Sequence, residues 1–188
     1  AFLAGFEEAK AVPGTTIRLV EGEYVISSVE VRDFVGTLKG AGMDKTTILA
    51  AMDLPCFEAA EENNVLSHLL KFIGGDVVIE GLTLRIPDGF ACATETFYGG
   101  RDLMTILSVT DWSEVYHPDN MYIKAIIRNV RFIGGNDDGS GASGPRNVSI
   151  GIWTGGDYYW WLEGHDYPFS NTDISIIDFG FIGCDFGI

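Results

Sequence analysis

The sequence predicts an all-β solenoid, in which short parallel strands stack coil upon coil behind a short N-terminal capping helix. The main observation is a repeat: an apolar strand, a corner residue and a second apolar strand occur together around Gly81, Asn129 and Asp178. These residues are spaced 48 and 49 positions apart, and a further step of 48 back from Gly81 reaches Asp33 in a similar stretch. Four matches at one period are typical of a repeat architecture. We therefore expect a solenoid in which Gly81, Asn129 and Asp178 occupy equivalent corners.

Each period is predicted to hold two coils of about 24 residues, because further short apolar strands lie between the repeated ones. These intermediate strands are expected at 47–49, 70–73, 105–109, 148–152 and 186–188. In a parallel sheet every second side chain points inward. The predicted inward residues are Ile79, Leu82, Leu84, Ile127, Val130, Phe132, Ile176, Phe179 and Phe181. The corner positions suit Gly, Asn and Asp, which tolerate left-handed backbone angles best.

The two ends of the chain differ. Residues 1–12 predict an amphipathic helix that ends at Pro13, and the exposed core end of a repeat protein needs such a cap. Residues 184–188 are typical of the start of another strand, with no capping segment after it. An uncovered parallel edge invites further pairing, so we expect either a longer solenoid or an end-to-end homo-oligomer. Residues 1–188 are predicted to form one domain.

The opening of the chain resembles a known superfamily. After the helix come Val-Pro-Gly-Thr-Thr-Ile-Arg-Leu at 12–19, Glu-Gly-Glu-Tyr at 21–24, Val-Gly-Thr-Leu-Lys-Gly-Ala-Gly at 35–42 and Thr-Thr-Ile at 46–48. This order is similar to that of the pectate lyase-like superfamily. The resemblance implies a right-handed parallel β-helix and an extracellular or cell-surface location. The superfamily includes lyases, hydrolases, epimerases and non-enzymatic surface proteins, so the fold does not choose the function.

A leucine-rich repeat is the structural alternative, because its coils have a similar length. Its consensus places leucine at most core positions and an asparagine in every coil. This chain prefers Ile, Val and Phe in its apolar strands and keeps one such asparagine, Asn129. The pattern therefore favours the β-helix.

Charge and composition exclude several classes of partner. The chain has 27 acidic and 12 basic residues, a formal net charge of −15. This argues against nucleic acid, whose phosphates need Lys and Arg, and against a polyanionic glycan unless a divalent cation intervenes. No apolar run approaches the roughly 20 residues that span a bilayer. Cys56, Cys92 and Cys184 are odd in number and widely spaced, which favours free thiols over a disulfide.

Two long loops carry aromatic residues suited to a ligand. The loop at 155–167 holds four adjacent aromatic residues, and the loop at 111–120 adds one more; together these are Trp112, Tyr158, Tyr159, Trp160 and Trp161. Such rings have a large apolar face that stacks on sugars, and a polar edge. The same rings would equally serve to anchor the loop on the flank of the strands. Both interpretations stay open at this point.

Acid–base candidates lie beside these aromatic residues. Glu163, His165 and Asp166 follow the aromatic run, and Asp137 and Asp138 stand in the loop before the preceding strand. The bases of loops on adjacent parallel strands are about 5 Å apart, so the two loops would wall one groove. A glycosidase uses two carboxyls about 5–5.5 Å apart if it is retaining and about 6.5–9.5 Å apart if it is inverting. We predict Glu163 or Asp166 as the acid and Asp137 or Asp138 as its partner, against solvated surface acids as the alternative.

A calcium-dependent polysaccharide lyase is the alternative chemistry. The stretch 136–140 places Asp137 and Asp138 beside a glycine turn that suits Ca²⁺, without the full EF-hand spacing. Arg128 and Arg131 are outward-facing candidates for the base that removes a proton next to a uronate carboxylate. We therefore expect a carbohydrate-active or carbohydrate-binding domain whose partner is a polysaccharide or glycan. A non-catalytic segment of a surface or adhesion protein is the alternative from another class.

Overall fold

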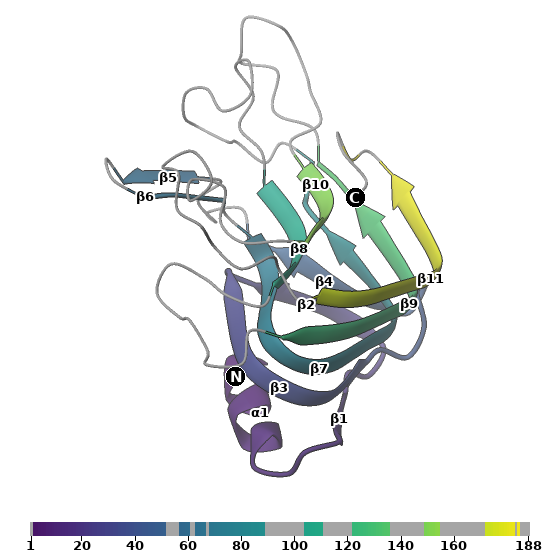
Figure 1. Ribbon diagram of the computed structural model, residues 1–188. Helices are drawn as coiled ribbons and strands as arrows, with labels where there is room; N and C mark the ends of the chain where they lie inside the picture. Colours follow the sequence, from purple (N-terminus) through teal and green to yellow (C-terminus); the bar gives the residue numbers. More distant parts are fainter. Residues whose placement is uncertain are drawn as a thin grey trace, which may run out of the picture.

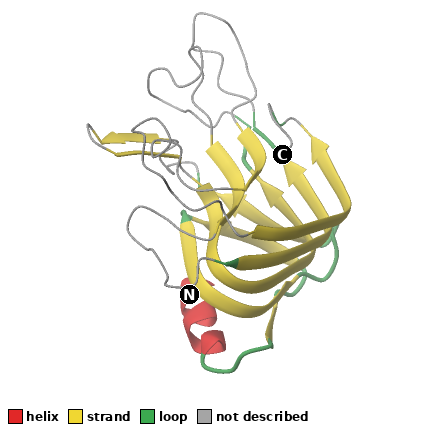
Figure 2. Ribbon diagram, viewed as in Figure 1, coloured by secondary structure: helices red, strands yellow, loops and turns green. Residues whose placement is uncertain are grey.

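A computed structural model describes residues 2–51, 57–60, 63–66, 68–88, 104–110, 122–135, 149–154, 172–182 and 184. These residues form one short helix and a parallel sheet of nine strands that curls into a half-barrel, together with a two-stranded antiparallel sheet (Figure 1, Figure 2). The helix is α1 (Phe2–Lys10), and the strands are β1 (Thr15–Arg18), β2 (Gly22–Ile26), β3 (Val29–Lys39), β4 (Thr46–Ala50), β5 (Phe57–Ala60), β6 (Asn63–Leu66), β7 (His68–Arg85), β8 (Met104–Thr110), β9 (Ile123–Ile133), β10 (Ser149–Thr154) and β11 (Thr172–Ile182). The mostly β prediction with an N-terminal helix is confirmed.

Strand β7 is the centre of the large sheet. Along one edge it pairs with β3 and β4; along the other its first residues pair with β8 and its later residues, from 75 to 85, with β9. Strands β1 and β2 extend the sheet beyond β3 and β4, whereas β10 and β11 extend it beyond β8 and β9. Every pairing in this sheet is parallel. Among the described strands, β1 and β2 therefore form one end of the sheet and β10 and β11 the other (Figure 1).

The strand register shows that the predicted coil length is wrong. Val130 of β9 lies opposite both Leu82 of β7 and Phe179 of β11, so strands one full period apart are immediate neighbours. One period is therefore a single layer of this stack and is not divided into two shorter coils. The predicted intermediate strands exist as β4, β8, β10 and the first part of β7, but they pair along other stretches of the sheet. The predicted strand at 186–188 lies outside the described residues.

The corner prediction for Gly81, Asn129 and Asp178 is confirmed, whereas the match of Asp33 to the same repeat position is wrong. Gly81, Asn129 and Asp178 have left-handed φ angles of 67°, 53° and 52°, and the residues on both sides of each are paired in register, so the three corners stack. Asp33 also has a positive φ, 51°, but the strand pairing places it opposite Gly74, where φ is 66°. The step from β3 to β7 is shorter than the period, which moves Asp33 to a different corner.

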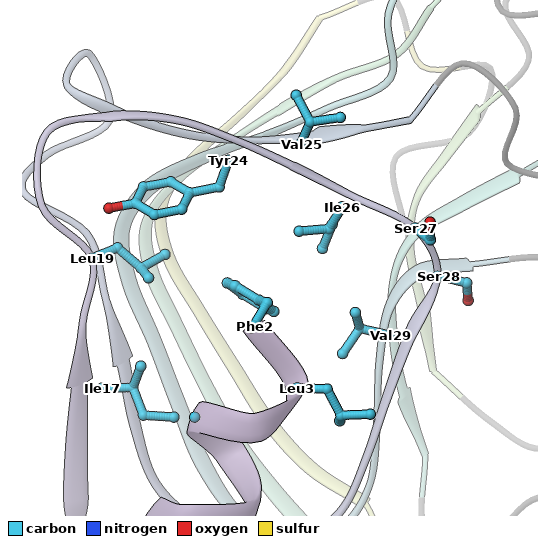
Figure 3. Close-up of a pocket in the computed structure, with 11 residues that line it drawn as sticks. Phe2, Leu3, Ile17, Leu19, Tyr24, Val25, Ile26, Ser27, Ser28 and Val29 are labelled. Atoms are coloured by element: carbon cyan, nitrogen blue, oxygen red, sulfur yellow. The ribbon is translucent and has the colours of Figure 1, made fainter.

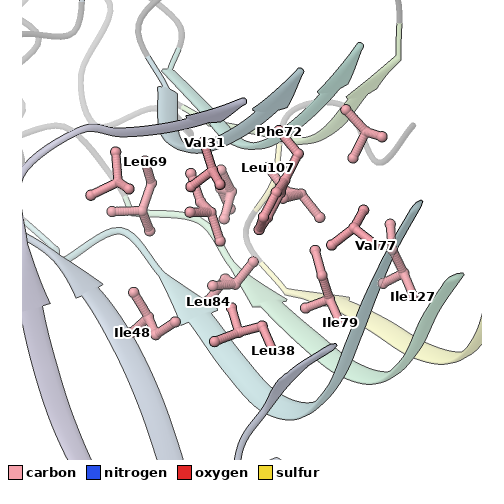
Figure 4. Packing of buried hydrophobic residues seen from close by; sticks show 14 of the residues in the cluster. Val31, Leu38, Ile48, Leu69, Phe72, Val77, Ile79, Leu84, Leu107 and Ile127 are labelled. Carbon is pink, nitrogen blue, oxygen red and sulfur yellow. The ribbon is translucent and has the colours of Figure 1, made fainter. Parts of the chain in front are cut away.

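The hydrophobic core fills the inside of the curl. The six predicted inward residues of β7 and β9 are all 0% exposed; they are Ile79, Leu82, Leu84, Ile127, Val130 and Phe132. The equivalent residues of β11 are less covered: Ile176 and Phe181 are partly buried, and Phe179 is 45% exposed. Core side chains from different parts of the sheet meet in this interior, among them Val31, Leu38, Ile48, Phe72 and Leu107 (Figure 4).

Helix α1 covers the first strands, as predicted for residues 1–12. Phe6 is fully buried, and its ring meets those of Phe34 and Phe72 edge-on, with centroids 5.1 and 5.7 Å away. Such pairs contribute about 0.5–1.5 kcal/mol beyond the apolar area they bury. The helix packs against β1 and β3, and it thereby links the N-terminus to the core.

Candidate functional site

An open groove lies at the corner where β3 ends beside β7. Its volume is about 340 Å³, and its lining residues are Lys39, Gly40, Ala41, Gly42, Met43, Glu80, Gly81 and Asn129. The lining combines two charged side chains and an amide with backbone from a glycine-rich turn. We call this feature the corner groove.

Three charged side chains form a row along the corner groove. Lys39 is the last residue of β3 and lies opposite Glu80 of β7, which in turn lies opposite Arg128 of β9. Neighbouring strands are about 4.8 Å apart, so side chains at the same register position point the same way and can touch. We call Lys39, Glu80 and Arg128 the charge row.

Glu80 holds the two cations of the charge row. One carboxylate oxygen, Oε1, accepts a hydrogen bond from Lys39 Nζ at 2.5 Å, and Oε2 accepts one from Arg128 Nε at 2.5 Å. The Glu80 side chain is 11% exposed, whereas those of Lys39 and Arg128 are 42% and 49% exposed. The hydrogen bond from Lys39 is the main cause that lowers the pKa of the Glu80 carboxyl, and Arg128 adds to it although burial acts in the opposite direction.

The turn between β3 and β4 is fixed beside the groove by side chains of two neighbouring strands. Thr83 donates a hydrogen bond from Oγ1 to the carbonyl oxygen of Met43 at 2.7 Å, and Arg131 Nη1 lies 2.7 Å from Asp44 Oδ1. The backbone N–H of Gly42 donates to the carbonyl oxygen of Gly81 at 2.8 Å. The groove wall is therefore held by the sheet itself.

Cationic side chains gather at and beside the corner groove, although the chain as a whole is strongly acidic. Lys39 and Glu80 line the groove, Arg128 shares the Glu80 carboxylate, and Arg131 pairs with Asp44 of the neighbouring turn. An ammonium carries three N–H donors and a guanidinium five, so donors remain after the contacts to the carboxylates. This arrangement suits a ligand that presents hydroxyl or carboxylate oxygens.

The residues predicted from the loops lie outside the described part of the chain. These are the acid–base and metal candidates Asp137, Asp138, Glu163, His165 and Asp166 and the aromatic residues Trp112, Tyr158, Tyr159, Trp160 and Trp161. Their roles stay predictions. Within the described residues, no group of three or more His, Cys, Asp or Glu side chains is placed to hold a metal ion.

Arg128 and Arg131 are described, and both point outward as predicted. Arg128 lies in the charge row and Arg131 pairs with Asp44. Sequence reasoning missed Lys39 and Glu80. Glu80 precedes the corner residue Gly81 as Arg128 precedes Asn129, which was a usable signal; Lys39 is closer to Glu80 in sequence than one period, so the repeat does not reveal their contact.

A second cavity lies beside α1 and is apolar. Its volume is about 610 Å³, and Figure 3 shows its lining on α1, β1, β2 and the turn into β3: Phe2, Leu3, Gly5, Ile17, Leu19, Tyr24, Val25, Ile26, Ser27, Ser28 and Val29. We call this feature the N-terminal cavity. None of its lining residues is charged, whereas Lys39 and Glu80 line the corner groove.

Comparison of the chain with protein-family models, with curated proteins and with solved structures gives no match. In the part of the chain that the structure describes, no helix is long and apolar enough to cross a membrane. The corner groove is therefore the feature from which we infer a function.

Proposed function

We propose that this chain is a domain that binds a polysaccharide along the corner groove. The observation that carries the proposal is the charge row, in which Glu80 orients an exposed lysine and an exposed arginine on neighbouring strands. The same resemblance that suggested the fold, to the pectate lyase-like superfamily, supports this ligand class and an extracellular or cell-surface location.

We also propose the handedness and the class of the parallel sheet. We infer a right-handed parallel β-helix, because β3, β7, β9 and β11 pair directly and in that order, each with the next repeat along the chain. Parallel strands joined by crossover connections are right-handed in about 98% of cases. The stacked corners at Gly81, Asn129 and Asp178 support the same arrangement.

A polysaccharide fits the charge row because it is an extended polymer and the cations lie on successive strands. The row continues to Arg18 of β1, which lies opposite Lys39, so cations recur across the stacked strands. An extended polymer lying along this line would present sugar hydroxyl or uronate oxygens to Arg18, Lys39 and Arg128 in turn. Ammonium and guanidinium groups donate strongly to such oxygens. A nucleic acid fits less well, because its phosphates would face the chain's net charge of −15.

Catalysis would add the loop residues to this binding site. In the hydrolase version, Glu163 or Asp166 is the acid and Asp137 or Asp138 its partner. In the lyase version, Asp137 and Asp138 would hold Ca²⁺, which would supply positive charge to offset a uronate carboxylate. The ion pairs of Arg128 and Arg131 favour binding and orientation as the roles of these two residues, because each guanidinium already donates to a carboxylate and has further donors for a ligand.

A panel of neutral and acidic polysaccharides, with and without Ca²⁺, tests the function by isothermal titration calorimetry. The native chain should bind at least one polysaccharide, and Arg128→Ala should weaken that binding by about tenfold or more, since a charge-assisted hydrogen bond contributes about 1.5–3 kcal/mol. Arg32→Ala is the matched control: Arg32 is 42% exposed and pairs with Glu30 at 2.6 Å, in the first part of β3.

Three outcomes decide the proposal. Weaker polysaccharide binding by Arg128→Ala, with binding by Arg32→Ala unchanged, supports the proposal. Failure of the folded native chain to bind any member of the panel, or an equal loss for both arginine variants, contradicts it. New reducing ends during incubation would add hydrolysis to the function, and ultraviolet absorbance from unsaturated uronates would add a lyase reaction.

A further inference from the structure

The corner groove is small, and most of its lining is uncharged. Its volume of about 340 Å³ is near the lower end of the range for ligand pockets, about 300–1,000 Å³, which suits one unit of a polymer. The amide of Asn129 both donates and accepts hydrogen bonds, as a sugar hydroxyl does. The other uncharged lining residues are Gly40, Ala41, Gly42, Met43 and Gly81.

The cations at and beside the groove are already bound by carboxylates of the chain itself. Glu80 binds Lys39 with one oxygen and Arg128 with the other, so both of its oxygens are occupied. Arg131 pairs with Asp44 of the adjoining turn at 2.7 Å. The positive charge of these side chains is therefore largely offset before a ligand arrives.

Further charges around the same corner also balance. Asp178 is exposed and follows Asn129 in the stack of corners. Lys45 of the adjoining turn lies 4.0 Å from Glu21, and Arg18 lies one strand beyond the groove lining. The described charges at and beside the groove are then four cations and four carboxylates: Lys39, Lys45, Arg128, Arg131, Glu21, Asp44, Glu80 and Asp178. Little net charge remains to attract a polyanion, and the chain as a whole, at −15, repels one.

A carboxylate on the ligand would come close to that of Glu80. Lys39 Nζ lies 2.5 Å from Glu80 Oε1, so an oxygen that accepts another N–H of the same ammonium at about 2.8 Å lies about 4–5 Å from Oε1. Glu80 stays ionised at neutral pH, because its pKa is lowered, chiefly by the hydrogen bond from Lys39. Two carboxylates at this distance repel each other, and such like-charge contacts are a strong source of selectivity. A hydroxyl oxygen accepts the same N–H groups without this repulsion.

We propose that the corner groove binds one neutral sugar unit of the polysaccharide, and that Glu80 disfavours a uronate unit there. This inference rests on the proposed function and narrows its ligand from polysaccharides in general to neutral ones. The remaining N–H donors of Lys39 and Arg128 bind hydroxyl oxygens, and Asn129 exchanges hydrogen bonds with a further hydroxyl. Of the two catalytic versions, the hydrolase fits this ligand, because the lyase version requires a uronate carboxylate.

Isothermal titration calorimetry at neutral pH with matched oligosaccharides tests the proposal. The two members of each pair share a backbone and differ in whether their units carry a carboxylate: glucan and glucuronan, mannan and mannuronan, and methyl-esterified and free galacturonan. The native chain should bind the neutral member of at least one pair about tenfold or more tightly than the acidic member. In Glu80→Gln, this ratio should fall by about tenfold or more. The control Glu30→Gln removes the same charge from the ion pair with Arg32, in the first part of β3, and should keep the native ratio.

The ratio of the two affinities separates selectivity from binding itself. A native chain that binds acidic members as tightly as neutral ones overturns this inference and leaves polysaccharide binding in place. A ratio that is unchanged in Glu80→Gln, or that falls equally in Glu30→Gln, overturns the role of Glu80; circular dichroism first establishes that both variants are folded. A folded native chain that binds none of these oligosaccharides also overturns the inference, and the proposed function fails with it if the whole polysaccharide panel gives no binding.

Discussion

Replacing Glu80 by glutamine removes the negative charge that holds the charge row together. Glutamine has nearly the same volume, so the packing of β7 against β3 and β9 stays in place. Its amide can still accept a hydrogen bond from Lys39 or Arg128, but its NH₂ group faces the other cation with a donor. The substitution therefore isolates the electrostatic part of the interaction.

The expected loss follows from the contacts and their exposure. Glu80 makes hydrogen bonds to two charged groups at 2.5 Å, and such bonds contribute about 1.5–3 kcal/mol each when they are well shielded. Lys39 and Arg128 are about half exposed, so water recovers part of the loss. We expect the free energy of unfolding to fall by about 2 kcal/mol, or the Tm by about 4–8 °C for a chain of this length.

The pH dependence of this difference has a definite sign. The pKa of Glu80 is lowered in the folded chain from its reference value of 4.5. The unfolded chain therefore binds the proton more tightly, and Glu80 stabilises the fold fully above that reference value. As the pH falls below 4.5 and through the folded pKa, the difference between the native chain and Glu80→Gln should shrink toward zero.

Urea unfolding at a series of pH values measures both quantities. The control is Glu30→Gln, because Glu30 pairs with Arg32 two residues away in the same strand and should contribute less than about 1 kcal/mol. A difference for Glu80→Gln that equals that of Glu30→Gln at neutral pH, or that persists unchanged well below pH 4.5, would refute the reasoning.

Two further predictions concern the backbone and the one described thiol. Gly75 has a φ of 94°, and a Cβ there would meet the backbone of Phe34, so Gly75→Ala should lower the free energy of unfolding by about 2–4 kcal/mol; Gly5→Ala, where a Cβ meets open space in α1, should change it by less than about 1 kcal/mol and in the stabilising direction. Equal melting temperatures for the two variants would contradict this account of the corner at Gly75. Burial raises the pKa of the Cys184 thiol to about 11, so its alkylation at pH 8, followed by peptide mapping, should be about a hundredfold slower in the folded chain than in urea; similar rates would show that the thiol is not shielded.

The periodic part of the fold was visible in the sequence because its corners impose a chemical requirement. A left-handed backbone angle favours Gly, Asn or Asp, and these residues mark the stacked corners at Gly81, Asn129 and Asp178. The alternation of apolar residues around them also identified the core of β7 and β9. Both signals lie within short stretches of the sequence, so they can be recognised before the strand neighbours are known.

Strand adjacency was harder to predict, because apolar strands look alike whichever neighbour they pair with. The strands at 105–109 and 148–152 were predicted to separate the repeated ones, whereas β8 pairs with the first part of β7 and β10 pairs with β8. Asp33 was misplaced for the same reason, since the step from β3 to β7 is shorter than the step from β7 to β9.

The residues of the candidate site also differ in whether the sequence revealed them. Arg128 stands next to a corner residue, so the repeat placed it on the outer face. Lys39 joins Glu80 only through the shorter step between β3 and β7, which the sequence does not reveal. The loop residues that looked most chemical, such as Glu163 and Asp137, lie outside the described part of the chain, and their proposed roles rest on composition and spacing.

Amide hydrogen exchange with and without a polysaccharide ligand tests the central claim most directly, because it locates the contact on the chain. We predict that ligand binding slows exchange mainly at 39–43, 80–81 and 128–129, around the charge row. Protection at 111–120 and 155–167, with no change at these three segments, would place the ligand on the loops and contradict the corner groove as the binding site.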